Sequence, residues 1–300
     1  MTDAPEVHVI AGALFDAGGR VLVAQRPRGR HMAGRWEFPG GKLNPGEDRL
    51  AGLKRELAEE LGIEVRAARP LIRLHHSYPD RRVLLDVWRI HEYAGVPTGL
   101  DGQALAWVSL DELPGHELLE ADRAIVTALR LPPLARVIAG SDELATLGRS
   151  EPQTLLWPIG DSADERLDTV LVRAARAAGH RVFVLGVGAD AVRIAALGGA
   201  DGAVLRRRDQ NLHVDRRGAF LVGVLCEDEQ GAREATAEGA HFLIVAPGKG
   251  PLPQAELGRL CETAGVPVFA GWYPDACRMD RLQMLGAHGC AILAKKGAGS

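Results

Sequence analysis

The chain has 300 residues, more than a typical single domain, so we expect two domains. Hydrophobic residues make up 46% and charged residues 25%, which is typical of a globular protein with enough apolar residues for two cores. The formal net charge is −3, and residues 1–130 hold 17 of the 36 basic and 19 of the 39 acidic residues. Neither half is basic enough to predict docking on a nucleic-acid duplex.

The sequence predicts a cytoplasmic protein. Its N-terminus lacks a basic start followed by an apolar core, so we expect no signal peptide. No apolar run reaches the length of a membrane span. The cysteines are far apart, form no C-x-x-C and are expected to be reduced, mostly buried thiols: Cys226, Cys261, Cys277 and Cys290.

The first half alternates strand and helix patterns. Its predicted strands cover 6–15, 20–26, 65–77, 82–92 and 104–109, and its predicted helices cover 47–61 and 121–130. A glycine-containing turn, 16–19, joins the first two strands. Leucines recur at spacings of three and four between Glu47 and Leu61, and Gly62 is expected to end that helix. These elements predict an α/β/α sandwich with a mixed sheet.

Leu131-Pro132-Pro133 interrupts the pattern because two prolines cannot continue a helix, so we place a domain boundary there and expect domains at 1–130 and 131–300. Beyond it, alanine-rich helical stretches end in glycine and are followed by short apolar strands. Continuous apolar strands suit a parallel sheet that is buried on both faces. About eight of them predict a compact (β/α)₈ barrel of the TIM type, with an open doubly wound sheet as the alternative.

Three glutamates lie on the first predicted helix. Glu56, Glu59 and Glu60 occupy positions i, i+3 and i+4, so their carboxylates share one face of the helix. Three like charges repel one another, and a hard divalent cation such as Mg²⁺ would relieve the repulsion. The glycines at positions 40 and 41 would let the backbone approach phosphate or metal closely.

The spacing of this stretch is specific. It contains Gly41, Glu47, Arg55-Glu56-Leu57, Glu59-Glu60 and Gly62-Ile63, separated by five, seven, one and one residues. It resembles the Nudix box of the Nudix hydrolases at every position, and the resemblance covers about residues 6–130. The segments at 31–33, 37–42 and 78–81, and Gly102-Gln103 before Trp107, resemble the MutT branch. Enzymes of that branch hydrolyse oxidised purine nucleoside triphosphates, notably 8-oxo-dGTP, to the monophosphate and pyrophosphate.

The resemblance implies roles for individual residues. Glu56, Glu59 and Glu60 would ligate Mg²⁺, or alternatively Mn²⁺, together with the backbone carbonyl of Gly40. Arg55 would belong to the catalytic group, and with Glu47 it would hold the carboxylates in place. The substrate would contact Arg26, His31, Phe38, Gly40, Gly41, Lys42, Tyr78 and Asp122, among which Phe38 would line the base pocket and Asp122 would read the base.

Two positions depart from the MutT pattern. Asp122 stands where MutT has asparagine, and an acidic group there reads a purine edge either as an acceptor or in its protonated form. Ala106 precedes Trp107 where MutT has a further glutamate. The identity of the general base is therefore open, with Glu56 and Glu60 as the candidates.

The function expected from these residues is Mg²⁺-dependent hydrolysis of a nucleoside triphosphate, with 8-oxo-dGTP as the leading substrate. A Nudix hydrolase for CTP, dCTP or a nucleoside-diphosphate sugar is the enzymatic alternative. A fold that only senses a nucleotide is the non-enzymatic alternative, against which the intact glutamate triad argues.

Residues 134–294 resemble thiamine phosphate synthase and its relatives in segments at 200–205, 222–227, 238–242 and 286–290. The active-site signatures of that family are replaced, after the second, sixth and seventh strands, by residues 157–161, 247–250 and 270–273. We therefore expect a degenerate barrel that acts as a scaffold, a homodimer surface or a binding module. A bifunctional protein that keeps thiamine phosphate synthase activity is the alternative.

Overall fold

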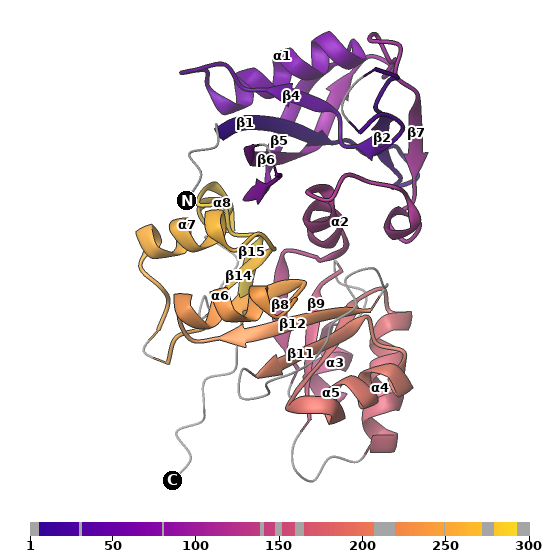
Figure 1. Cartoon of the computed structure of the whole chain (residues 1–300). Helices are drawn as coiled ribbons and strands as arrows, with labels where there is room; N and C mark the ends of the chain where they lie inside the picture. Colours follow the sequence, from indigo (N-terminus) through magenta and orange to yellow (C-terminus); the bar gives the residue numbers. More distant parts are fainter. Residues whose placement is uncertain are drawn as a thin grey trace. The chain divides into compact units, whose positions relative to one another are not determined.

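The computed structural model describes residues 6–29, 32–79, 81–138, 141–147, 152–159, 165–206, 220–248, 250–271 and 279–292. The chain divides into two compact units, Met1–Arg130 and Leu131–Ser300 (Figure 1). Within the described ranges, every helix is too short or too polar to cross a membrane.

The first unit contains two small sheets. A four-stranded mixed sheet has the order β4 (Gly40–Lys42), β1 (Glu6–Ala13), β6 (Arg82–Ala94) and β5 (Glu64–Ser77). In it β1 and β6 are parallel, while the other two pairs are antiparallel. An antiparallel three-stranded sheet has the order β3 (Trp36–Glu37), β2 (Val21–Gln25) and β7 (Leu105–Val108). A single turn of 3₁₀-helix, η1 (Leu113–Gly115), follows β7.

Helices α1 (Arg49–Leu61) and α2 (Asp122–Arg130) cover opposite faces of the four-stranded sheet (Figure 1). Alternation along β6 explains the arrangement, because successive strand residues point to opposite faces. Trp88 packs with Leu57 of α1, whereas Val87 belongs to the separate apolar cluster that contains Ile125 of α2. The first unit therefore has the α/β architecture that the sequence predicts.

Helix α1 begins two residues later than the sequence pattern suggests, so the predicted start at Glu47 is wrong. Asp48 has extended backbone angles, and its side chain accepts a hydrogen bond of 3.0 Å from the Ala51 N–H. This is an N-cap, which satisfies a donor that the first helical turn leaves free. Glu47 consequently lies before the helix. At the other end, Gly62 adopts the left-handed conformation and donates to the Ala58 carbonyl, as expected of a glycine that ends a helix.

The second unit is a closed barrel of parallel strands. The order around it is β8 (Leu134–Val137), β9 (Thr154–Pro158), β10 (Arg181–Gly186), β11 (Gly202–Arg206), β12 (Leu221–Cys226), β13 (Phe242–Val245), β14 (Val268–Gly271) and β15 (Gly289–Ile292). Strand β15 pairs with β8 and closes the ring. The sequence prediction of an eight-stranded parallel barrel is confirmed, and the open-sheet alternative is wrong.

The helices described in the barrel unit follow individual strands. They are α3 (Ser141–Leu147), α4 (Glu165–Ala177), α5 (Gly188–Gly198), α6 (Glu229–Ala237), α7 (Gln254–Thr263) and α8 (Met279–Met284). Two apolar clusters pack these helices against the strands. Cys226, Cys261 and Cys290 are buried thiols outside any disulfide, as predicted, while Cys277 lies outside the described residues.

A separate apolar cluster fills the inside of the barrel. Phe183, Phe242 and Phe269 are fully buried and stack edge to face, with ring centroids 5.1 Å and 5.9 Å apart. Edge-to-face pairs match the positive edge of one ring to the negative face of the next. The interior is therefore a packed core, as in other small parallel barrels.

Candidate active site

Strand β4 lies close against helix α1 at the predicted site. A Cβ atom placed on Gly41 would lie 2.1 Å from Oε2 of Glu56, so only glycine leaves room for this carboxylate. Glu56 is half-buried, whereas the Glu59 side chain is 61% exposed. The close approach of β4 therefore fixes Glu56 more tightly than Glu59.

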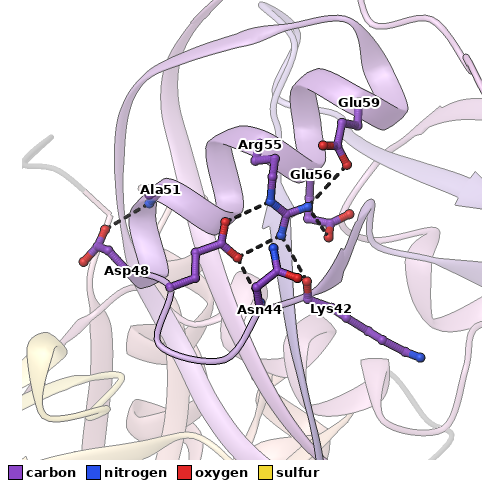
Figure 2. Close-up of polar contacts among 8 residues, drawn as sticks. Lys42, Asn44, Asp48, Ala51, Arg55, Glu56 and Glu59 are labelled. Carbon is purple, nitrogen blue, oxygen red and sulfur yellow. Dashed lines mark hydrogen bonds and ion pairs between the residues drawn. The ribbon is translucent and has the colours of Figure 1, made fainter.

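Arg55 connects most of the acidic groups of this region (Figure 2). Its Nε and Nη2 atoms donate to both oxygens of Glu47, at 2.8 and 2.9 Å. Its Nη1 atom donates to Glu56 at 2.8 Å and more weakly to Glu59 at 3.3 Å. Nη2 also donates to the Lys42 carbonyl at 3.1 Å. Arg55 thus ties helix α1 to the loop before it and to strand β4.

The same network explains the acidity of Glu47. The hydrogen bonds from Arg55, followed by the one from the Asn44 N–H at 2.9 Å, lower the pKa of Glu47 to about 2. Both bonds favour the ionised carboxylate. Glu47 therefore stays charged at any pH at which the protein works and holds the Arg55 side chain in place.

Glu60 has different surroundings. Its Oε2 atom accepts a hydrogen bond of 3.0 Å from the Gly40 N–H. Burial, chiefly, raises the pKa of Glu60 to about 7 against the opposing effect of the Gly40 bond, and the nearby negative charges of Glu37, Glu56 and Asp101 contribute to the rise. Several acidic groups are therefore near enough to Glu60 to repel its negative charge.

The three glutamates fit a hard divalent cation by their chemistry. Among the described residues, however, no group of three or more His, Cys, Asp or Glu side chains is arranged so that it could hold a metal ion. Glu56 and Glu59 instead contact Arg55, and Glu60 contacts Gly40. All three glutamates nevertheless lie on one face of α1. The ion pair between Arg55 and Glu59 contributes little to stability, because the Glu59 side chain is exposed to solvent. Carboxylates are ligands that Mg²⁺ prefers.

A second acidic residue is buried at the start of helix α2. Asp122 is only 4% exposed, and its Oδ2 atom accepts a hydrogen bond of 3.3 Å from the Phe38 N–H. Burial, and then the negative charge of Glu37, raise the pKa of Asp122 well above its usual range. Glu37 itself forms an ion pair with Arg26. Phe38, Arg26 and Asp122 thus belong to one neighbourhood.

One short segment joins this neighbourhood to the helix α1 glutamates. The Phe38 N–H contacts the Asp122 carboxyl group, and the Gly40 N–H contacts the Glu60 carboxylate. Two residues of extended chain span at most ~7 Å. The two buried acids are therefore held at neighbouring points along the same segment.

The remaining predicted residues are less closely engaged. The Lys42 side chain is exposed and points away from the Arg55 network in Figure 2. Tyr78 is half-buried against the first-unit core, and its ring packs edge to face on His76 at 4.5 Å. Burial, followed by the charge of Asp122, raises the pKa of Tyr78. His31 and Asp80 lie outside the described residues.

Sequence reasoning missed a buried ion pair behind the site. Asp86, fully buried on β6, accepts a 2.7 Å hydrogen bond from Nη2 of Arg49 and one of 3.0 Å from Nε1 of Trp88. Arg49 is the first residue of α1, so this pair ties the first turn of the helix to strand β6. The available signal was a single acidic residue inside the apolar run Val83-Leu84-Leu85-Asp86-Val87-Trp88.

Comparisons with known proteins agree with this geometry. The family described as "NUDIX domain" matches residues 10–128. An 8-oxo-dGTP diphosphatase of Proteus vulgaris is 42% identical over 31% of this chain and 83% of its own. A CTP pyrophosphohydrolase of Escherichia coli is 35% identical over 43% of this chain and 96% of its own. An 8-oxo-dGTP diphosphatase of Escherichia coli is 30% identical over 42% of this chain and 97% of its own.

The fold of the first unit and its acidic helix thus define a hydrolase of phosphoric anhydrides. The chain belongs to the Nudix hydrolase family, through its first 130 residues or so. Membership of this family supports a divalent metal cofactor.

Proposed function

We propose that the first unit is a Mg²⁺-dependent nucleoside triphosphate pyrophosphohydrolase whose main substrate is 8-oxo-dGTP, which it cleaves to 8-oxo-dGMP and pyrophosphate. The observation that carries the proposal is the segment from Phe38 to Gly40, which contacts the buried Asp122 at one end and Glu60 at the other. A base bound beside Asp122 would place its triphosphate along the helix α1 glutamates. The similarity to two 8-oxo-dGTP diphosphatases supports the choice of substrate.

The roles of the chain's own residues follow from their surroundings. Glu56, Glu59 and Glu60, with the Gly40 carbonyl, would hold the metal, which when bound neutralises the polyphosphate and acidifies water. Arg55 and Glu47 would keep Glu56 in place through the bonds described above. Glu56 and Glu60 both stay candidates for the general base, because the raised pKa of Glu60, about 7, belongs to the metal-free protein and a bound divalent cation would lower it.

Asp122 would read the base. Because its pKa is raised well above the usual range, the carboxyl group keeps its proton to higher pH than an ordinary aspartate, and in that form it donates a hydrogen bond. A protonated Asp122 would donate to a purine oxygen and accept from a neighbouring N–H, as an asparagine side chain does. Phe38, which is buried beside it, would line the pocket for the base.

A second candidate substrate is CTP or dCTP. The similarity to a CTP pyrophosphohydrolase, over 96% of its length, favours it. A panel of 8-oxo-dGTP, dGTP, CTP, dCTP and a nucleoside-diphosphate sugar, assayed for pyrophosphate or phosphate release with and without Mg²⁺, separates the candidates. A preference for CTP or for the sugar nucleotide of more than about tenfold in kcat/KM would reject the 8-oxo-dGTP assignment.

For the barrel unit, residues 131–300, we propose a degenerate TIM-type barrel related to thiamine phosphate synthase that has lost its catalysis. Trp157 packs on the outside of the barrel in place of a polar signature residue. The Ala270-Gly271 pair is buried, while Gly160-Asp161, Lys249 and Trp272-Tyr273 lie outside the described residues. Condensation of the thiazole phosphate and pyrimidine diphosphate precursors at enzymatic rates would refute the proposal.

A further inference from the structure

The loop between β6 and β7 closes the C-terminal end of helix α1. The last four carbonyl groups of a helix have no partner within the helix. Here the Thr98 N–H donates to the Leu61 carbonyl and the Leu100 N–H donates to the Glu60 carbonyl, both at 3.0 Å. A loop that is far from α1 in sequence therefore holds the residue that carries one of the acidic side chains.

Gln103 adds a side-chain bond to the same carbonyl. Its Nε2 atom donates to the Glu60 carbonyl at 3.1 Å, and its own Oε1 atom is buried without a hydrogen-bond partner among the described residues. Only the NH₂ end of the amide is a donor, so the bond fixes the orientation of the side chain. A Cβ on Gly99 would lie 2.2 Å from the Gln103 carbonyl oxygen, so the loop folds closely around this residue.

The position of Gln103 is set by the three-stranded sheet. The next residue, Ala104, accepts a 2.8 Å hydrogen bond from the Gln25 N–H, and Leu105 then pairs with Ala24 in β7 and β2. Gln103 thus stands at the junction between a strand and the end of helix α1. Its side-chain hydrogen bond therefore links the Glu60 backbone to the three-stranded sheet.

Glu60 is held at both ends as a result. Its carboxylate accepts from the Gly40 N–H, and its carbonyl accepts from Leu100 and Gln103. The other two glutamates of the helix contact the guanidinium of Arg55 instead. We propose that Gln103 is a positioning residue, which sets the place of the Glu60 carboxylate in the active site through the Glu60 carbonyl. The proposal rests on the proposed function only for its effect on rate.

The expected kinetic signature is a loss of kcat with little change in KM. Substrate would bind through its base and its phosphate groups, whereas the Gln103 side chain bonds to the Glu60 backbone. A small displacement of a reacting group costs up to 10²-fold in rate. Since the loop bond from Leu100 remains, we expect a loss of about tenfold when Gln103 stops donating.

Two substitutions and one control test the proposal in the full-length protein. Gln103→Met keeps the length of the side chain and removes the donor. Gln103→Glu keeps the shape but directs a carboxylate at the Glu60 carbonyl, so that two acceptors face each other. Thr98→Val, in the same loop, removes only the exposed hydroxyl bond to the Val96 carbonyl and leaves the backbone contact with α1.

Two readouts are measured for each variant. The first is kcat and KM for pyrophosphate release from 8-oxo-dGTP with Mg²⁺. The second is the Gly40 amide peak in ¹H–¹⁵N NMR spectra of the metal-free protein, because the Gly40 N–H contacts the Glu60 carboxylate directly. The amide peak reports the position of Glu60 even where no substrate is turned over.

We expect kcat to be highest in the wild type, lower in Gln103→Met and lowest in Gln103→Glu. In both variants KM should stay within about twofold of the wild-type value, and the Gly40 peak should be displaced. Thr98→Val should match wild type in both readouts. A Gly40 peak that stays in place in Gln103→Met, or a kcat equal to that of Thr98→Val, would overturn the inference. If the wild type hydrolyses no nucleotide, the proposed function fails, and the Gly40 peak alone decides the positioning role.

Discussion

Replacing Glu60 with glutamine should stabilise the protein at high pH. The pKa of Glu60 is raised from 4.5 to about 7, chiefly by burial, so the folded state holds a proton on this group that the unfolded state releases. At 1.36 kcal/mol per pKa unit, ionised Glu60 costs the metal-free protein roughly 3 kcal/mol above pH 7. Glu60→Gln removes the charge and keeps an acceptor for the Gly40 N–H.

The sign of the effect depends on pH. Because the folded pKa lies above the unfolded one, the stability associated with protonated Glu60 is complete below about pH 4.5 and is lost as pH rises through about 7. The stabilisation by Glu60→Gln should therefore be small at pH 5 and largest at pH 8. At roughly 3 to 4 °C per kcal/mol, the melting temperature of the first unit should rise by about 10 °C at most at pH 8.

Scanning calorimetry of the full-length protein in the presence of a chelator measures this effect. The difference between variant and wild type at each pH cancels the contributions of His76 and His91, whose pKa values burial lowers. Activity should fall even as stability rises, since Glu60 belongs to the proposed metal site. A variant that melts below the wild type at pH 8, or a difference that does not shrink toward pH 5, would refute the reasoning.

Three further predictions concern other parts of the structure. Gly41→Ala should lower kcat at least tenfold, because the added Cβ would displace the Glu56 carboxylate. Gly115→Ala is the control and should leave kcat unchanged, because nothing lies within 4 Å of the Cβ that it adds. Equal rates in the two variants would contradict the close approach of β4 to Glu56. Asp86→Asn should lower the free energy of unfolding in urea by about 3 kcal/mol, since it leaves Arg49 without its buried partner, and a loss below about 1 kcal/mol would show that the pair does not anchor α1. Phe242→Ala should lower the free energy of unfolding of the barrel unit by about 3 to 5 kcal/mol, because it leaves a cavity inside the barrel. Pyrophosphate release by the first unit should persist. Loss of barrel stability and of pyrophosphate release together would contradict two separate cores.

The regular elements were predictable because their signals are local. The leucines of α1 and the apolar runs of the barrel strands depend on spacing within about ten residues, and the predicted strands of the first unit lie within about two residues of their observed bounds. The start of α1 was misplaced because the Asp48 cap, rather than the leucine pattern, decides it. Strands β3 and β4 have two and three residues, too few for any periodicity, and exist only through pairing with β2 and β1.

The sequence predicts which residues form the candidate site but not how their side chains are arranged. The box spacing identifies Glu56, Glu59 and Glu60 as neighbours, but it does not show which hydrogen-bond partner each carboxylate has. In the fold, Arg55 bonds two of them, and the Gly40 N–H bonds the third. Gln103 likewise reaches the Glu60 carbonyl across 43 residues, a contact that only the tertiary structure creates.

The central claim is that the acidic face of helix α1 catalyses hydrolysis of a nucleoside triphosphate. Its most direct test is pyrophosphate release from 8-oxo-dGTP during a Mg²⁺ titration of the wild type and of Glu56→Gln. We predict release that saturates with Mg²⁺ in the wild type and falls by more than 10²-fold in the variant. Wild-type rates in Glu56→Gln, or release that does not depend on added divalent metal, would contradict the claim.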